Sequence, residues 1–193
     1  MVKCLARVLL TSMFAGSIFG AYAQKSKFAG INAGLESASS FFRPGYGVHY
    51  EQRLSGRSGF EIGVLHRSYS RNLYVTMSNQ SGFHSSNIIL TESHISIPAV
   101  YKRYTRIVDI SAGPSFEFYI GWRQRGDNPS MRVSHYSLTD AFNIGLLAKV
   151  SKTLKLSDRF YLEPDVRFNP ILTNDRNYIA FGLAGKFKLE NSR

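Results

Sequence analysis

A strict alternation of apolar and polar residues between positions 109 and 123, "DISAGPSFEFYIGWR", constrains the fold more than any other feature of this chain. The apolar set is Ile110, Ala112, Pro114, Phe116, Phe118, Ile120 and Trp122, and the other set is Asp109, Ser111, Gly113, Ser115, Glu117, Tyr119, Gly121 and Arg123. Because successive side chains of a strand point to opposite faces, this pattern predicts one long strand with one apolar face. Alternation alone leaves open whether that face meets a protein core or lipid.

Seven further segments repeat the pattern and predict seven more strands. They are residues 29–36, 46–54, 60–67, 93–104, 142–152, 160–170 and 178–188. No segment shows a convincing helical pattern, and after the first 23 residues no stretch approaches the ~18 apolar residues of a membrane helix. If the chain spans a membrane, it must therefore do so as a closed barrel. Pro98, Pro114 and Pro164 fall inside predicted strands, and we interpret them as bulges because proline cannot donate to a ladder.

The N-terminus has the composition of an export signal. Lys3 and Arg7 precede an apolar run that ends in the small residues Ala21 and Ala23. This pattern predicts a cleaved secretory signal peptide over residues 1–23 and a barrel domain over residues 24–193. The alternative is a retained membrane anchor, although the run is short for one. Cys4 precedes the apolar run, so the mature chain would contain no cysteine.

The mature chain would be strongly basic. Removing Lys3 and Arg7 from the 24 basic residues leaves 22 against 13 acidic ones, a net charge of +9. An exported chain rarely meets nucleic acid, so we expect no nucleic-acid partner. Anionic lipid headgroups or surface polysaccharide are the expected counter-charges.

The predicted connections alternate in length. Residues 37–45, 68–92, 124–141 and 171–177 follow the odd strands, and residues 55–59, 105–108 and 153–159 follow the even strands; the first set is mostly longer, although residues 171–177 follow the rule imperfectly. Short turns on one rim and longer loops on the other are typical of bacterial outer-membrane barrels with both termini at the periplasmic rim. The sequence thus predicts an all-β fold, an eight-stranded antiparallel up-and-down transmembrane β-barrel.

In a barrel of eight strands the interior is narrow enough to be filled by side chains. We therefore expect the polar faces to form a polar, side-chain-filled lumen in which charges pair. The predicted lumen charges are Glu51, Arg53, Glu61, Asp109, Glu117, Lys149, Glu163, Asp165, Arg167 and Lys186. One hypothesis is that Glu117, Lys149, Asp165 and Arg167 form a single buried network. Aromatic girdles are expected at Trp122, Phe142 and Phe168 on one rim and at Tyr101, Phe160 and Phe187 on the other.

A second set of charges is predicted at the long-loop rim. It consists of Arg43, Arg71, Arg123, Arg125 and Arg132. Guanidinium groups suit the phosphates of lipopolysaccharide, so this rim is a candidate lipopolysaccharide-facing surface. The preferred alternative is a solvated basic rim with no specific ligand.

Several segments resemble a known family. "ISIPAVYKRY" (95–104) and "ISAGPSFEFYIG" (110–121) resemble the paired fourth and fifth strands of the PorT-like outer-membrane β-barrel domain common in Bacteroidota. "GVHYEQRLSGRSGFEIGVLHR" (47–67) is similar to the second hairpin of that family, and residues 143–174 to a later strand, turn, strand and loop. The resemblance implies location in the outer membrane of a Gram-negative cell envelope. It implies outer-membrane lipid, the barrel-assembly machinery and an unidentified envelope protein as partners.

The sequence shows no strong catalytic signal. His135 and Ser137 are faintly similar to the His-x-Ser of lipid A deacylases, but Leu138 stands where those enzymes have asparagine. Glu92 and His94 share a predicted strand face, where we expect a pair satisfied within the protein. The five histidines lack metal-ligand spacing, so no metal and no cofactor is expected.

We therefore predict a non-enzymatic protein with a structural or surface-interaction role. Two alternatives stay open. One is a small outer-membrane lipid hydrolase that uses His135 and Ser137. The other is an exported, soluble, lipocalin-like barrel with its faces inverted, which would bind an apolar ligand inside.

Overall fold

The computed structural model describes residues 26–38, 41–79, 82–126, 140–174 and 176–189. The predicted signal peptide and Arg132, His135 and Ser137 lie outside these residues. Within the described ranges, no helix is long and apolar enough to cross a membrane.

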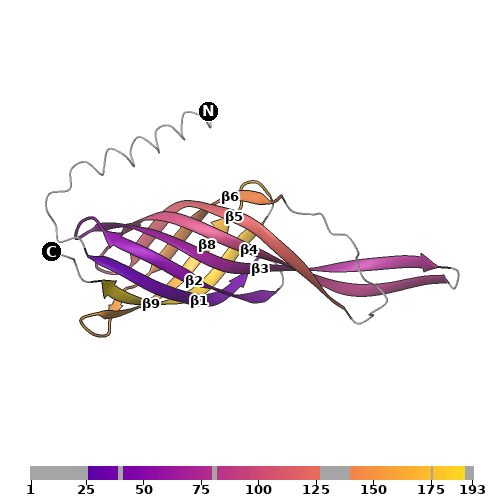
Figure 1. Cartoon of the computed structure of the whole chain (residues 1–193), viewed down its shortest axis with the longest axis horizontal. Coiled ribbons are helices and arrows are strands. Elements are labelled where there is room, and N and C mark those ends of the chain that lie inside the picture. The colour runs from indigo at the N-terminus through magenta and orange to yellow at the C-terminus, as the bar shows by residue number, and fades with distance from the viewer. Residues whose placement is uncertain (1–25, 39–40, 80–81, 127–139, 175, 190–193) are drawn as a thin grey trace, which may run out of the picture.

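The described residues form nine strands in one antiparallel sheet (Figure 1). The strands are β1 (Lys27–Ser37), β2 (Phe42–Arg53), β3 (Ser58–Asn79), β4 (Gly82–Arg103), β5 (Asp109–Gly126), β6 (Phe142–Ser151), β7 (Leu154–Lys155), β8 (Phe160–Pro170) and β9 (Asn177–Leu189). Their order is β6-β5-β4-β3-β2-β1-β9-β8-β7, and a further pairing of β6 with β8 closes the sheet. Eight strands therefore form a ring, as the alternation predicted. The two-residue β7 is an addition that pairs with β8 inside the connection from β6.

The ring separates the two faces of each strand. In β6, exposed and buried residues alternate along the whole strand, with Phe142 and Leu146 exposed and Asn143 and Lys149 buried. The same alternation runs along β8 from Glu163 to Asn169. The polar faces predicted for these strands are thus buried inside the ring, and the apolar faces are exposed on its outer wall.

The two rims of the ring differ. Residues 54–57, 104–108 and 152–159 connect strands at the rim where β1 begins and β9 ends, which we call the short-turn rim. The opposite rim, which we call the hairpin rim, carries the connections 38–41, 80–81, 127–141 and 171–176. Only one of these exceeds ten residues, so the predicted alternation of connection lengths is wrong in detail.

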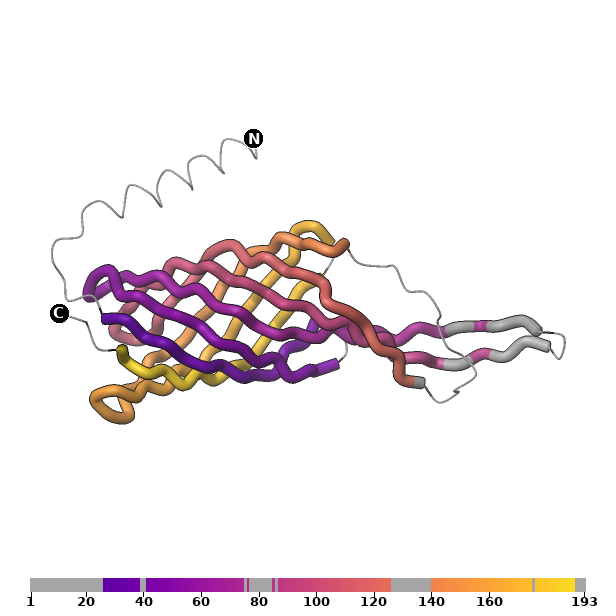
Figure 2. Tube along the Cα trace, in the orientation of Figure 1, coloured from indigo at the N-terminus to yellow at the C-terminus, as the bar shows by residue number. Residues whose placement is uncertain are grey.

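The main reason is that β3 and β4 are each 22 residues long. They pair continuously from Ser68 with Ser93 to Asn79 with Gly82, where the sequence suggested a loop over residues 68–92. Figures 1 and 2 show the resulting hairpin projecting far beyond the hairpin rim. The predicted loop is therefore wrong, because the serines and asparagines of this segment take ladder positions in β3 and β4.

The bulges expected at prolines are also wrong. Pro114 pairs with Leu146 and Pro164 pairs with Leu183 in regular register. A register shift between β4 and β5 instead lies between Ser93 and His94, at the base of the projecting hairpin. Each proline forgoes a single ladder hydrogen bond without displacing its strand.

Candidate functional site

The interior of the ring near the short-turn rim is filled by a cluster of three lysines and three glutamates. Each of six strands contributes one of them, and all are at most 8% exposed. This lysine–glutamate cluster consists of Glu51 (β2), Glu61 (β3), Lys102 (β4), Lys149 (β6), Glu163 (β8) and Lys186 (β9). Charges of opposite sign are therefore balanced one to one across the interior.

Every ammonium group in the lysine–glutamate cluster contacts at least two carboxylates. Lys102 Nζ lies 3.1 Å from Glu51 Oε2 and 2.5 Å from Glu163 Oε2. Lys149 Nζ lies 2.6 Å from Glu61 Oε1 and 3.3 Å from Glu163 Oε1. Lys186 Nζ binds Glu51 Oε2 at 2.5 Å and also binds Glu163. Glu163 thus forms ion pairs with all three lysines and lies at the centre of the cluster.

Residues of the short-turn rim complete the contacts of this cluster. The Tyr104 hydroxyl donates to Glu51 Oε1 at 2.7 Å, and burial together with that carboxylate raises the pKa of Tyr104. The Arg53 guanidinium lies 4.4 Å from the centre of the Tyr104 ring. The Thr153 hydroxyl lies 2.8 Å from Asp109 Oδ2 and 2.9 Å from Glu163 Oε2. Tyr104 and Thr153 therefore border the cluster on the side of the short-turn rim.

A second interior group lies closer to the hairpin rim, around Arg67 of β3. Its guanidinium donates to Glu36 Oε2 at 2.7 Å and to Glu117 Oε1 at 3.3 Å, and it also donates to Asn169. The guanidinium carbon lies 4.0 Å from the centre of the Tyr178 ring. One fully buried arginine thereby joins β1, β3, β5, β8 and β9.

The expected pairing of Glu92 with His94 is observed, with His94 Nε2 3.2 Å from Glu92 Oε2, and Arg176 contacts both residues. Arg176 Nη1 lies 2.8 Å from His94 Nε2 and 3.3 Å from Glu92 Oε2. Arg71 Nη2 contacts Glu92 Oε1 at 3.0 Å. The pair is a closed structural contact, as the sequence suggested.

Of the ten predicted lumen charges, nine are buried and Arg53 is half-buried at the short-turn rim. Glu117, Lys149, Asp165 and Arg167 do not form the single network considered above. Arg167 Nε binds its own strand neighbour Asp165 at 2.5 Å, Glu117 binds Arg67, and Lys149 belongs to the lysine–glutamate cluster. Four further charged residues are buried in the interior that were not among the ten predicted lumen charges: Glu36, Arg67, Lys102 and Arg176.

Four of the five predicted basic rim residues lie within the described residues. Arg43 Nε donates to Ser70 Oγ at 2.8 Å, and Arg71 is held by Glu92. Arg123 and Arg125 are exposed near the end of β5, and Arg132 lies outside the described residues. A lipopolysaccharide-facing surface at this rim stays a prediction. No group of three or more His, Cys, Asp or Glu side chains in the described residues is arranged to hold a metal ion.

The structure was compared with known proteins. No family model matches the sequence, and no curated protein matches it. The resemblance to PorT-like barrels therefore stays a prediction.

Solved structures share the architecture at low sequence identity. The outer membrane protein OprG from Pseudomonas aeruginosa is similar with a TM-score of 0.54 at 10% identity, over 87% of this chain and 98% of that chain. The N-terminal β-barrel domain of Pseudomonas aeruginosa OprF gives a TM-score of 0.45 at 12% identity, over 86% of this chain and 100% of that one. Ail, the attachment invasion locus protein of Yersinia pestis, gives 0.43 at 10% identity, over 86% and 97%. The similarity to OprG shows that the chain has the fold of a small outer-membrane β-barrel.

Proposed function

We propose that this protein is an outer-membrane β-barrel with a filled interior and a structural or surface-interaction role. The observation that carries the proposal is the exposure of large apolar side chains around the outer wall. Phe42, Phe181 and Leu146 are 61%, 57% and 50% exposed, and they come from β2, β9 and β6. Soluble monomers rarely expose contiguous apolar patches above a few hundred Å². A wall that is apolar around the ring is stable when it faces lipid.

The distribution of charge supports the same conclusion. The interior holds the lysine–glutamate cluster and the group around Arg67, whereas the outward positions of β6 hold only Phe142, Ile144, Leu146, Ala148 and Val150. A lipocalin-like protein would need the opposite arrangement, with an apolar interior for its ligand. The soluble alternative is therefore disfavoured.

The filled interior also argues against a role as a general diffusion pore. The ion pairs of the lysine–glutamate cluster extend across the ring from β2 to β6 and β8. Water-filled channels need about sixteen strands.

The β3–β4 hairpin projects beyond the ring (Figure 2). We infer that any surface interaction uses this hairpin. The hydrolase alternative has no supporting contact, since His135 and Ser137 lie outside the described residues.

The proposal is tested by electrophoresis of the detergent-extracted membrane fraction with and without boiling. We expect the unboiled protein to migrate as a compact, SDS-resistant species that shifts on heating. Recovery in the soluble periplasmic fraction, without a heat shift, would refute the proposal. A variant that lacks residues 75–86 of the hairpin should keep the heat shift, which separates barrel formation from any surface interaction.

A further inference from the structure

The outer wall of the ring is hollowed near the short-turn rim. A groove of about 790 Å³ crosses β9, β1, β2 and β3. Most of its lining is apolar and includes Ile31, Val48, Ile62, Val64, Phe160 and Phe187. The volume falls within the range of roughly 300–1,000 Å³ that is typical of ligand pockets.

The groove exists because small residues interrupt the belt of large ones. Gly185 stands at an outward position of β9, in register with Leu162 on β8 and Ile31 on β1. A Cβ atom at Gly185 would meet no heavy atom within 4 Å. Ala29 on β1 extends the gap toward the rim, where the rings of Phe160 and Phe187 pack at 5.2 Å between centroids. The hollow is therefore a slot in a wall that otherwise carries Leu, Ile and Phe.

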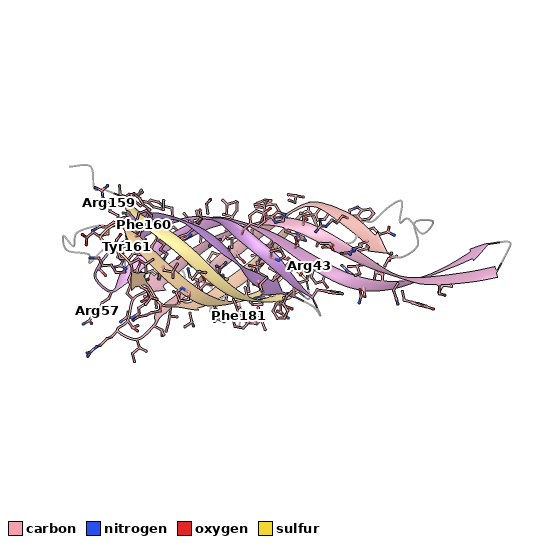
Figure 3. All side chains as sticks on the ribbon, turned by 90° about the horizontal axis from the view of Figure 1, so that it is seen from below. Arg43, Arg57, Arg159, Phe160, Tyr161 and Phe181 are labelled. Carbon is pink, nitrogen blue, oxygen red and sulfur yellow. The ribbon has the colours of Figure 1, made fainter. Side chains whose placement is uncertain are left out.

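Cationic residues stand where the strands of the groove end at the short-turn rim. Lys27 precedes Ala29 by two residues on the same strand face, and Arg159 directly precedes Phe160. Figure 3 shows Arg57 and Arg159 at the same end of the ring as Phe160, and Phe181 and Arg43 farther from it. Asp158, an exposed carboxylate of this rim, is bound by Lys155 at 2.7 Å. The rim beyond the groove is thus electropositive.

An apolar slot that ends near cations at a membrane boundary matches the two parts of an anionic lipid, its acyl chain and its phosphate. We propose that the groove holds an acyl chain of an anionic glycerophospholipid whose phosphate lies at Lys27 and Arg159. Cations at a membrane surface attract anionic lipids, and a zwitterionic lipid would gain less from this rim. The inference rests on the proposed function, because an acyl chain reaches the outer wall only if that wall faces lipid.

Native mass spectrometry of the whole protein in detergent tests the inference, with phosphatidylglycerol and phosphatidylcholine as the two probes. We expect one phosphatidylglycerol adduct. The lipid concentration at which it saturates should be lower than that for phosphatidylcholine by about fivefold for each contributing cation. Gly185→Phe fills the slot without a clash at its Cβ and should remove the adduct of either lipid. Lys27→Gln with Arg159→Gln should abolish the preference for phosphatidylglycerol.

Matched controls separate these effects from general changes in the wall or in charge. Ala148→Phe adds an outward ring on β6, on another part of the wall, and should bind both lipids as the unchanged protein does. Arg123→Gln with Arg125→Gln removes the same charge from β5 near the hairpin rim and should keep the preference.

The possible failures are distinguishable. Equal binding of the two lipids, or full binding by Gly185→Phe, in protein that still shows the heat shift would overturn the lipid site and leave the outer-membrane proposal standing. A protein that is soluble without detergent would overturn both.

Discussion

At the scale of single residues, the interior charges are stable only as a set. Glu163 is fully buried and contacts Lys102, Lys149 and Lys186. Glu163→Gln would leave three ammonium groups with two carboxylates. Breaking a buried ion pair from one side costs about 3–5 kcal/mol, so we expect a loss of that size in the free energy of unfolding. Urea unfolding of the protein in lipid vesicles measures it.

The charge balance provides the control. Adding Lys102→Met to Glu163→Gln restores equal numbers of the two charges, so the double variant should lose less stability than the sum of the single variants. Asp158→Asn, at an exposed pair with Lys155, should change the free energy of unfolding by less than about 0.5 kcal/mol. A near-neutral Glu163→Gln would contradict a dry, tightly paired interior.

Backbone packing makes a second residue-scale prediction. A Cβ atom on Gly113 would lie 2.1 Å from the Ala99 carbonyl oxygen and 2.8 Å from Val100 Cα. These are backbone atoms of the neighbouring β4 and cannot give way without moving the strand. We expect Gly113→Ala to reduce the free energy of unfolding by about 1–3 kcal/mol. Gly185→Ala, whose Cβ enters open space, should stay within about 0.5 kcal/mol of the unchanged protein.

Alternation sorts the residues of each strand onto two faces but does not say which of them pair. Lys149 and Glu163 were assigned to the interior from their position in the period of two, and both are buried. Their contact depends on the register of β6 and β8 around the closed ring, which no local pattern encodes. Arg67 was missed because Leu65 and His66 obscure the pattern, although it continues the parity of Glu61 and Gly63.

At the scale of elements, the β3–β4 hairpin is the part that sequence patterning described least well. Residues 68–92 are rich in serine and asparagine, which are common in loops. The segment is nevertheless paired, and nearer the ring Ser70, Ile88 and Leu90 are buried. At its base β5 adds a third strand, up to the pairing of Ile88 with Gly126. Isolated two-stranded hairpins are marginally stable, so this support from β5 matters.

The hairpin tip should be dispensable for folding. Tyr74 pairs with Asn87, so residues 75–86 can be replaced by Asn-Gly, which favours a two-residue hairpin turn. We expect this variant to keep the heat shift of the unchanged protein on electrophoresis, because the ring loses no pairing. Replacing residues 66–95 instead removes Arg67 and Glu92 from the interior, and that variant should not fold. Loss of folding in the shorter replacement would show that the tip contributes to the ring.

At the scale of the whole molecule, charged side chains lie inside the ring and large apolar side chains lie on its outer wall, the reverse of a soluble globular protein. The eight strands of the ring were readable from the sequence, because each contains a segment with a period of two, whereas the outer parts of β3 and β4 were not. Which face points inward was inferred from the narrow interior of an eight-stranded ring, and burial of Glu51 and Lys186 agrees with it. The extra strand β7 escaped notice because two residues carry no period.

The environment of the outer wall gives the sharpest whole-molecule test. Leu146 is 50% exposed in the middle of β6, so in water Leu146→Lys should change stability by less than about 0.5 kcal/mol. If the wall faces hydrocarbon, the same change should cost about 2–4 kcal/mol, and Tyr101→Lys, close to the short-turn rim, only about 0–1 kcal/mol. Urea unfolding in vesicles of both variants decides between the two environments. Equal, small effects at both depths would mean that the apolar wall does not meet lipid, whereas a depth-dependent cost would locate Leu146 within the bilayer.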